Sequence, residues 1–102
     1  MILSGNEFKK RQLGVAVVGS GRMGSHRARL ASLHPAVSYL VVGDINEDQA
    51  RKLAEASKAN GYSTDNFELI NDPRVDVVIV STPEDQHRDS VEAAIMAGKS
   101  VL

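Results

Sequence analysis

Three glycines with the spacing G-x-G-x-x-G, Gly19, Gly21 and Gly24, follow an apolar run at residues 14–18. Gly19 would permit a tight turn out of a strand, and Gly21 a close approach of backbone to a pyrophosphate. Gly24 would let a new helix pack closely on that strand, and the unpaired N–H groups at the start of the helix would bind the phosphates. The alternative is an ordinary strand-to-helix turn that uses its glycines for geometry alone.

Asp44 follows a second, mostly apolar run at residues 37–42, at the distance from the glycines where a dinucleotide site carries its acid. A carboxylate can accept two hydrogen bonds from the adenosine ribose diol, and its charge would repel a 2′-phosphate, which favours NAD over NADP. The alternative is that Asp44 caps the following helix together with Asn46. The glycine spacing alone is weak, whereas strand, glycines, helix and acid together indicate a dinucleotide site.

The loop between the glycines supplies further candidates for contact with the cofactor, namely Ser20, Arg22 and Met23. Arg22 opens the expected helix and could reach a phosphate or stack on adenine, or else face solvent.

His87, near the start of a later helix, is a further candidate for contact with the cofactor. By helical spacing it shares a face with Val91, Ala94, Ile95 and Gly98, which we expect to pack on the sheet. From there it could touch the nicotinamide or a substrate, or serve as a hydrogen-bonded structural histidine.

Strand-like and helix-like segments alternate along the whole chain, which predicts an α/β fold with a doubly wound, parallel, Rossmann-type sheet. We expect strands at residues 13–18, 37–43, 62–64 and 75–80 and a fifth from residue 99, with helices at residues 22–33, 66–70 and 83–97 and one from Asn46 that Gly61 ends. Asn46 and Thr82 are the expected helix caps, with Pro83 at a first helical position. Because ligands bind beyond the carboxyl ends of parallel strands, Gly19, Asp44 and Ser81–Thr82 should meet at one edge.

Composition restricts the range of functions. The 102 residues make one domain at most, with a polar tail at residues 1–12 and a nucleotide-binding domain at residues 13–102. A net charge of −1 predicts no broad attraction to nucleic acid or membranes, and no apolar run is long enough to span one. The absence of cysteine excludes disulfides and thiolate metal sites and fits a reducing, cytoplasmic setting. His26 and His34 have no partner at metal-ligand spacing, so no metal site is expected.

Two segments resemble the glucose–fructose oxidoreductase, inositol 2-dehydrogenase and MocA family. They are residues 76–87, D-V-V-I-V-S-T-P-E-D-Q-H, and residues 92–102, E-A-A-I-M-A-G-K-S-V-L. The glycine motif is also typical of that family, so the resemblance extends over residues 13–102.

The resemblance implies an NAD(P)-dependent dehydrogenase that transfers hydride to or from a sugar, cyclitol or related alcohol. It implies that the three glycines line the pyrophosphate, that Asp44 holds the ribose, and that Ser81, Thr82, Pro83 and His87 lie near the nicotinamide half. It also implies a second domain that binds the substrate and often joins copies of the protein into a homo-oligomer.

The chain departs from the family pattern at several places. The family's Glu-Lys-Pro motif, with its catalytic lysine, would come after Leu102, so we assign no catalytic residue and expect the 102 residues alone to be inactive. Glu84 stands where many members have asparagine, and Arg27 where they have histidine. The alternative function is a non-catalytic NAD(P)-sensing module, against which the Thr82-Pro83…His87 stretch argues.

Overall fold

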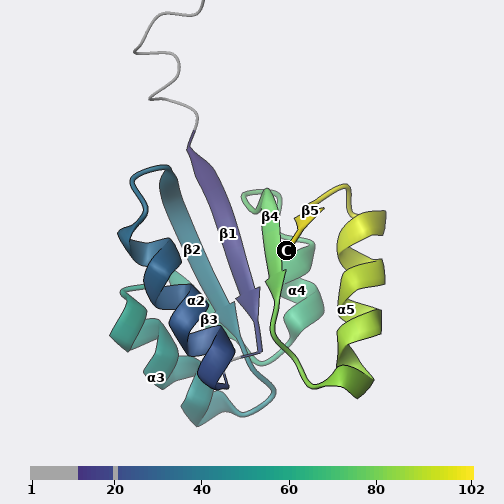
Figure 1. Cartoon of the computed structure of the whole chain (residues 1–102), viewed down its shortest axis with the longest axis horizontal. Coiled ribbons are helices and arrows are strands. Elements are labelled where there is room, and N and C mark those ends of the chain that lie inside the picture. The colour runs from purple at the N-terminus through teal and green to yellow at the C-terminus, as the bar shows by residue number, and fades with distance from the viewer. Residues whose placement is uncertain (1–11, 20) are drawn as a thin grey trace, which may run out of the picture.

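The computed structural model describes residues 12–19 and 21–102, which form a parallel sheet of five strands with helices on both faces (Figure 1). The elements are β1 (Leu13–Val18), α2 (Arg22–Leu33), β2 (Val37–Gly43), α3 (Glu47–Ser57), β3 (Gly61–Ser63), α4 (Asn66–Ile70), β4 (Val77–Val80), α5 (Glu84–Met96) and β5 (Ser100–Val101). The strand order is β3-β2-β1-β4-β5. Strands β2 and β3 thus lie on one side of β1, and β4 and β5 lie on the other side. The predicted doubly wound α/β fold is confirmed. The expected polar tail falls almost wholly outside the described residues.

The two faces of β1 anchor two separate apolar cores. Val15 and Val17 pack with residues of α2 and α3, whereas Ala16 and Val18 pack with residues of α4 and α5. Side chains alternate between the faces of a strand, so a strand covered on both sides must be apolar throughout, as β1 is. The carboxyl ends of the central strands are thereby fixed in a rigid layer.

The end of α3 differs from the prediction. The helix ends at Ser57, Lys58 adopts a left-handed conformation with φ of 54°, and Gly61 instead begins β3. The physical reason is Asn60, whose backbone N–H donates to the Leu40 carbonyl at 2.7 Å and whose side-chain oxygen accepts from the Leu40 N–H at 2.9 Å. Pairing with β2 therefore ends the helix before the glycine is reached.

The start of α5 also differs. Pro83 occupies the N-cap position rather than the first turn, no side-chain cap bond forms, and Thr82 does not cap the helix. Of the face expected to pack on the sheet, Val91 and Ala94 do pack on the apolar core. His87, Ile95 and Gly98 are exposed instead, and Ser90 is buried in their place, so the expectation is wrong for His87. Ser90 is small enough to pack against the sheet despite its hydroxyl.

A group of polar side chains, which we call the clasp, joins β2 to the turn before β4 at the amino-terminal edge of the sheet. Tyr39 Oη donates to Asp72 Oδ2 at 2.8 Å, and the Arg74 guanidinium donates to both Asp72 oxygens at 3.1 Å while lying 4.4 Å from the Tyr39 ring centre. The Arg74 hydrogen bond outweighs partial burial and lowers the pKa of Asp72 from 3.8 to about 2. The clasp lies at the edge opposite to the expected site.

Candidate functional site

The turn after β1 is pressed against the end of β4. Gly19 has a φ of +93°, and a Cβ atom there would lie 2.6 Å from backbone atoms of Ser81 and Thr82. Only glycine tolerates both the positive φ and the close approach. The glycine turn and the segment after β4, both expected at the site, are thus in direct contact.

Gly24 and Gly21 have opposite surroundings. A Cβ atom on Gly24 would lie 1.8 Å from the Gly19 carbonyl oxygen, so the first turn of α2 packs directly on the glycine turn, as predicted. A Cβ atom on Gly21 would meet no described atom within 4 Å, and its φ of −49° is open to any residue. The fold itself does not need a glycine at position 21, so the bare backbone there fits a group that approaches from outside.

A small pocket joins the carboxyl ends of three strands. It measures about 130 Å³ and is lined by Gly19, Asp44, Ile45, Asn66, Thr82, Pro83 and Gln86. The predicted convergence of Gly19, Asp44 and the end of β4 at one edge is therefore present in the structure.

Asp44 is half-buried at this pocket, and its Oδ1 accepts the Asn46 N–H at 2.8 Å. Asn46 in turn caps α3 by accepting the Gln49 N–H at 3.1 Å, as expected. Asp44 therefore supports the cap residue rather than capping the helix itself, and this contact orients its carboxylate at the mouth of the pocket.

Two buried polar atoms in the residues that line this pocket have no hydrogen-bond partner, Asn66 Oδ1 and Thr82 Oγ1. An unsatisfied buried polar atom costs about 1–3 kcal/mol, and Asn66 Oδ1 lies beside Gly43, the last residue of β2. Sequence reasoning missed Asn66 because it is the first residue of the short helix α4, which Asp65 caps by accepting the Phe67 N–H at 3.0 Å. Its place shortly after β3, at the carboxyl end of a strand, was the available signal.

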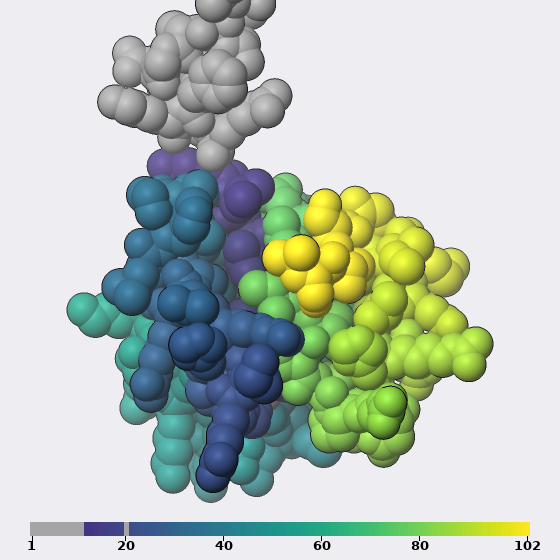
Figure 2. All heavy atoms as spheres, viewed as in Figure 1, coloured from purple at the N-terminus to yellow at the C-terminus, as the bar shows by residue number. Residues whose placement is uncertain are grey.

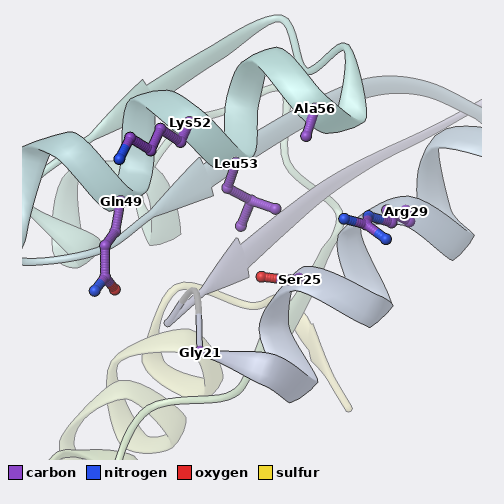
Figure 3. A pocket seen from close by; sticks show the side chains of 7 residues that line it. All are labelled: Gly21, Ser25, Arg29, Gln49, Lys52, Leu53 and Ala56. Carbon is purple, nitrogen blue, oxygen red and sulfur yellow. The ribbon is translucent and has the colours of Figure 1, made fainter.

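A second, larger hollow of about 380 Å³ opens beside Gly21 between α2 and α3 (Figure 3). Ser25 and Arg29 border it from α2, and Gln49 and Lys52 from α3. Neither Asp44 nor a residue at the end of β4 lines it.

Four further predicted residues are described but do not line the pocket, namely Arg22, Met23, Ser81 and His87. Arg22 and Met23 are exposed in the first turn of α2, and His87 is exposed in the first turn of α5, where its N–H bonds to the Pro83 carbonyl at 2.9 Å. Ser81 is half-buried and accepts a hydrogen bond from Arg27. Ser20 lies outside the described residues.

An open parallel sheet with this strand order, a glycine turn where the order reverses and an acid after β2 define a dinucleotide-binding Rossmann fold. Residues 13–102 match the family model GFO_IDH_MocA, described as an oxidoreductase family with an NAD-binding Rossmann fold. The chain belongs to this family, which confirms the resemblance seen in the sequence and the prediction of NAD as cofactor.

Relatives of known activity agree. The chain is 32% identical to scyllo-inositol 2-dehydrogenase (NAD(+)) of Bacillus subtilis, over 91% of this chain and 28% of that protein. It is 40% identical to an inositol 2-dehydrogenase/D-chiro-inositol 3-dehydrogenase of Shouchella clausii, over 86% of this chain and 26% of that protein. The chain thus spans little more than a quarter of the relatives it matches.

Among solved structures, the fold is similar to that of GenD2 from gentamicin A biosynthesis in complex with NAD. The TM-score is 0.82 at 35% identity, over 89% of this chain and 26% of that one. These relatives are oxidoreductases, so the alternative of a non-catalytic sensing module is not supported.

The sequence predicts neither a membrane-spanning segment nor a metal site, and the described part of the chain bears on both. Within residues 12–19 and 21–102, no helix has the length and apolar character needed to cross a membrane. Within the same residues, no group of three potential metal ligands comes together.

Proposed function

We propose that this chain binds NAD along the carboxyl edge of its sheet and supplies the cofactor-binding part of a dehydrogenase acting on a cyclitol, sugar or related alcohol. The observation that carries the proposal is Gly21, a glycine that the fold does not need and whose missing side chain leaves room for a pyrophosphate. Bound NAD would supply the hydride chemistry, while the protein would supply position and orientation.

The cofactor would cross three strand ends in turn. The adenosine ribose would bond to Asp44, the pyrophosphate would lie on the turn that holds Ser20, Gly21, Arg22 and Met23, and the nicotinamide half would lie over the end of β4. There Ser81, Thr82, Pro83 and His87 would be its neighbours. The start of α2 supports this path because its N–H groups and positive dipole end favour an anion.

Calorimetric titration of the chain with NAD and NADP tests the ribose role. We expect tighter binding of NAD, and in Asp44→Ser about a tenfold loss of NAD affinity with little loss for NADP, because the ribose loses its acceptor and a 2′-phosphate loses a repelling charge. Asp48→Ser is the matched control, since Asp48 is an exposed acid on the same loop-to-helix segment that pairs with Arg51. Equal or tighter binding of NADP by the unaltered chain would contradict the role of Asp44.

The activity of the whole protein is a separate part of the proposal and rests on the relatives' names, inositol dehydrogenases among them. A longer protein containing this chain should reduce NAD when supplied with inositols or simple sugars. We also propose a cytoplasmic, self-associating enzyme, on the grounds that these 102 residues hold no cysteine and that α2 leaves an apolar sheet surface uncovered. No NAD reduction with any polyol or sugar would contradict the substrate class.

A further inference from the structure

Arg27 links the second turn of α2 to the end of β4. Its Nη1 donates to Ser81 Oγ at 2.9 Å and to the Val80 carbonyl oxygen at 3.4 Å. These partners lie 54 and 53 residues further along the chain. The side chain is half-buried and borders an apolar hollow, and none of the ion pairs among the described residues includes it. The contacts given for this half-buried guanidinium are thus a serine hydroxyl and a backbone carbonyl at the end of β4.

The backbone at the end of β4 does not depend on this contact. The Ser81 N–H donates to the Val18 carbonyl at 2.8 Å, the Val80 N–H donates to the Leu102 carbonyl at 3.1 Å, and Gly19 packs against the Ser81 carbonyl. The chain path is therefore set by β1 and β5. What Arg27 sets is the direction of the Ser81 hydroxyl.

The position of Ser81 along the ligand path follows from the strand order and from the proposed function. Asp44 directly follows β2, the glycine turn follows β1, and Ser81 follows β4 on the far side of β1 from β2. With the adenosine ribose at Asp44 and the pyrophosphate at Gly21, the nicotinamide riboside is the part of NAD that reaches Ser81.

We propose that Arg27 is a positioning residue that makes Ser81 a hydrogen-bond donor to the nicotinamide riboside. A guanidinium has only donors, so Ser81 Oγ must accept from it, and the single hydroxyl hydrogen is left for an acceptor elsewhere. The adjacent cation also polarises the O–H bond and strengthens the bond it donates. The carboxamide carbonyl and the ribose oxygens of the nicotinamide half are acceptors of this kind.

Calorimetric titration with NAD and with ADP, which shares the adenosine and both phosphates but lacks the nicotinamide riboside, tests the proposal. Arg27→Leu should weaken NAD binding by about three- to tenfold, the value of one hydrogen bond, and leave ADP binding within about twofold. Ser81→Ala should cause the same loss for NAD, and the double variant no further loss, because both changes remove one interaction. Arg27→Lys, which keeps a donor and the charge, should restore part of the affinity.

The control is Arg51→Leu, the same change at a cation on α3 that pairs with Asp48, and urea unfolding of each variant reports its stability. If Arg27→Leu does not fold, Arg27→Gln and Ser81→Ala carry the same comparison. Equal weakening of ADP and NAD would show that Arg27 acts on the phosphates by its charge, and additive losses in the double variant would show that it does not act through Ser81. Either result overturns the proposal while NAD binding itself stands. Failure of the unaltered chain to bind NAD or ADP would overturn the proposed function as well.

Discussion

At the scale of single residues, the three glycines of one motif fall into two cases. Gly19 and Gly24 are glycines because backbone atoms of the protein itself occupy the space of a side chain, 2.6 Å and 1.8 Å from where a Cβ would be. Gly21 faces open space, so the fold itself sets no requirement for glycine there. The motif letters alone cannot separate these cases, and only the surroundings of each Cα do.

This difference predicts opposite effects on stability and binding. Gly21→Asp should keep or raise the free energy of unfolding, by up to about 1 kcal/mol, because aspartate is a favourable N-cap for α2. The same change should abolish measurable NAD binding, since a carboxylate would occupy the pyrophosphate position. Gly24→Ala should instead lower the free energy of unfolding by more than about 2 kcal/mol through overpacking.

Urea unfolding and calorimetric titration of both variants measure these effects, with Gly21→Ser as a smaller, uncharged control. Unchanged NAD binding in Gly21→Asp would show that the turn does not contact the cofactor.

At the scale of elements, local signals account for what could be predicted. The observed bounds of β1, α2, β2 and α4 are those expected, because glycines, prolines and Asx residues mark their ends. The end of α3 was not predictable, because Lys58 takes a left-handed conformation imposed by the pairing of Asn60 with β2. The buried face of α5 was only partly predicted, because Ser90 is polar by type yet only 3% exposed. Thr82 was expected at the pocket from its place after β4, whereas the approach of Asn66 depends on the packing of α4, which no local pattern encodes.

The clasp between β2 and the start of β4 predicts a dependence of stability on pH. Because the pKa of Asp72 is lowered to about 2, its contribution to stability is present above its unfolded value near pH 4 and is lost as pH falls through 2. Asp72→Asn should cost about 1–2 kcal/mol at neutral pH, after allowance for screening by water. Urea unfolding at pH 7 and at pH 2.5 measures the difference between the two proteins, which should shrink in acid. A difference that stays constant would mean that ionisation of Asp72 contributes nothing.

At the scale of the whole molecule, the helical layers are unequal. On the face of α2, the side of β4 next to β1 stays partly uncovered. The strip lies between α2 in blue and the carboxyl-terminal residues in yellow (Figure 2). The hollow there measures about 330 Å³ and is lined almost wholly by apolar side chains, including Leu30, Val77 and Ile79. Exposed apolar surface of this kind favours association.

Sedimentation velocity over a range of concentrations should therefore show reversible self-association of the chain. Leu30→Lys, at the edge of the hollow and 55% exposed, should weaken it, because a charge would have to be buried at the contact. Leu33→Lys is the matched control, since Leu33 is 80% exposed and does not line the hollow. A monomer at all concentrations, or equal effects of both changes, would contradict an association through this face.

The clasp and the cofactor pocket stand at opposite rims of one sheet, with the two apolar cores between them. Protein engineers could exploit that separation. A library that randomises the loops after β1, β2 and β4 to accept a different coenzyme would leave Tyr39, Asp72 and Arg74 untouched. Stabilising substitutions collected at their rim should then compensate for losses incurred at the other, so that affinity and robustness could be evolved in independent rounds.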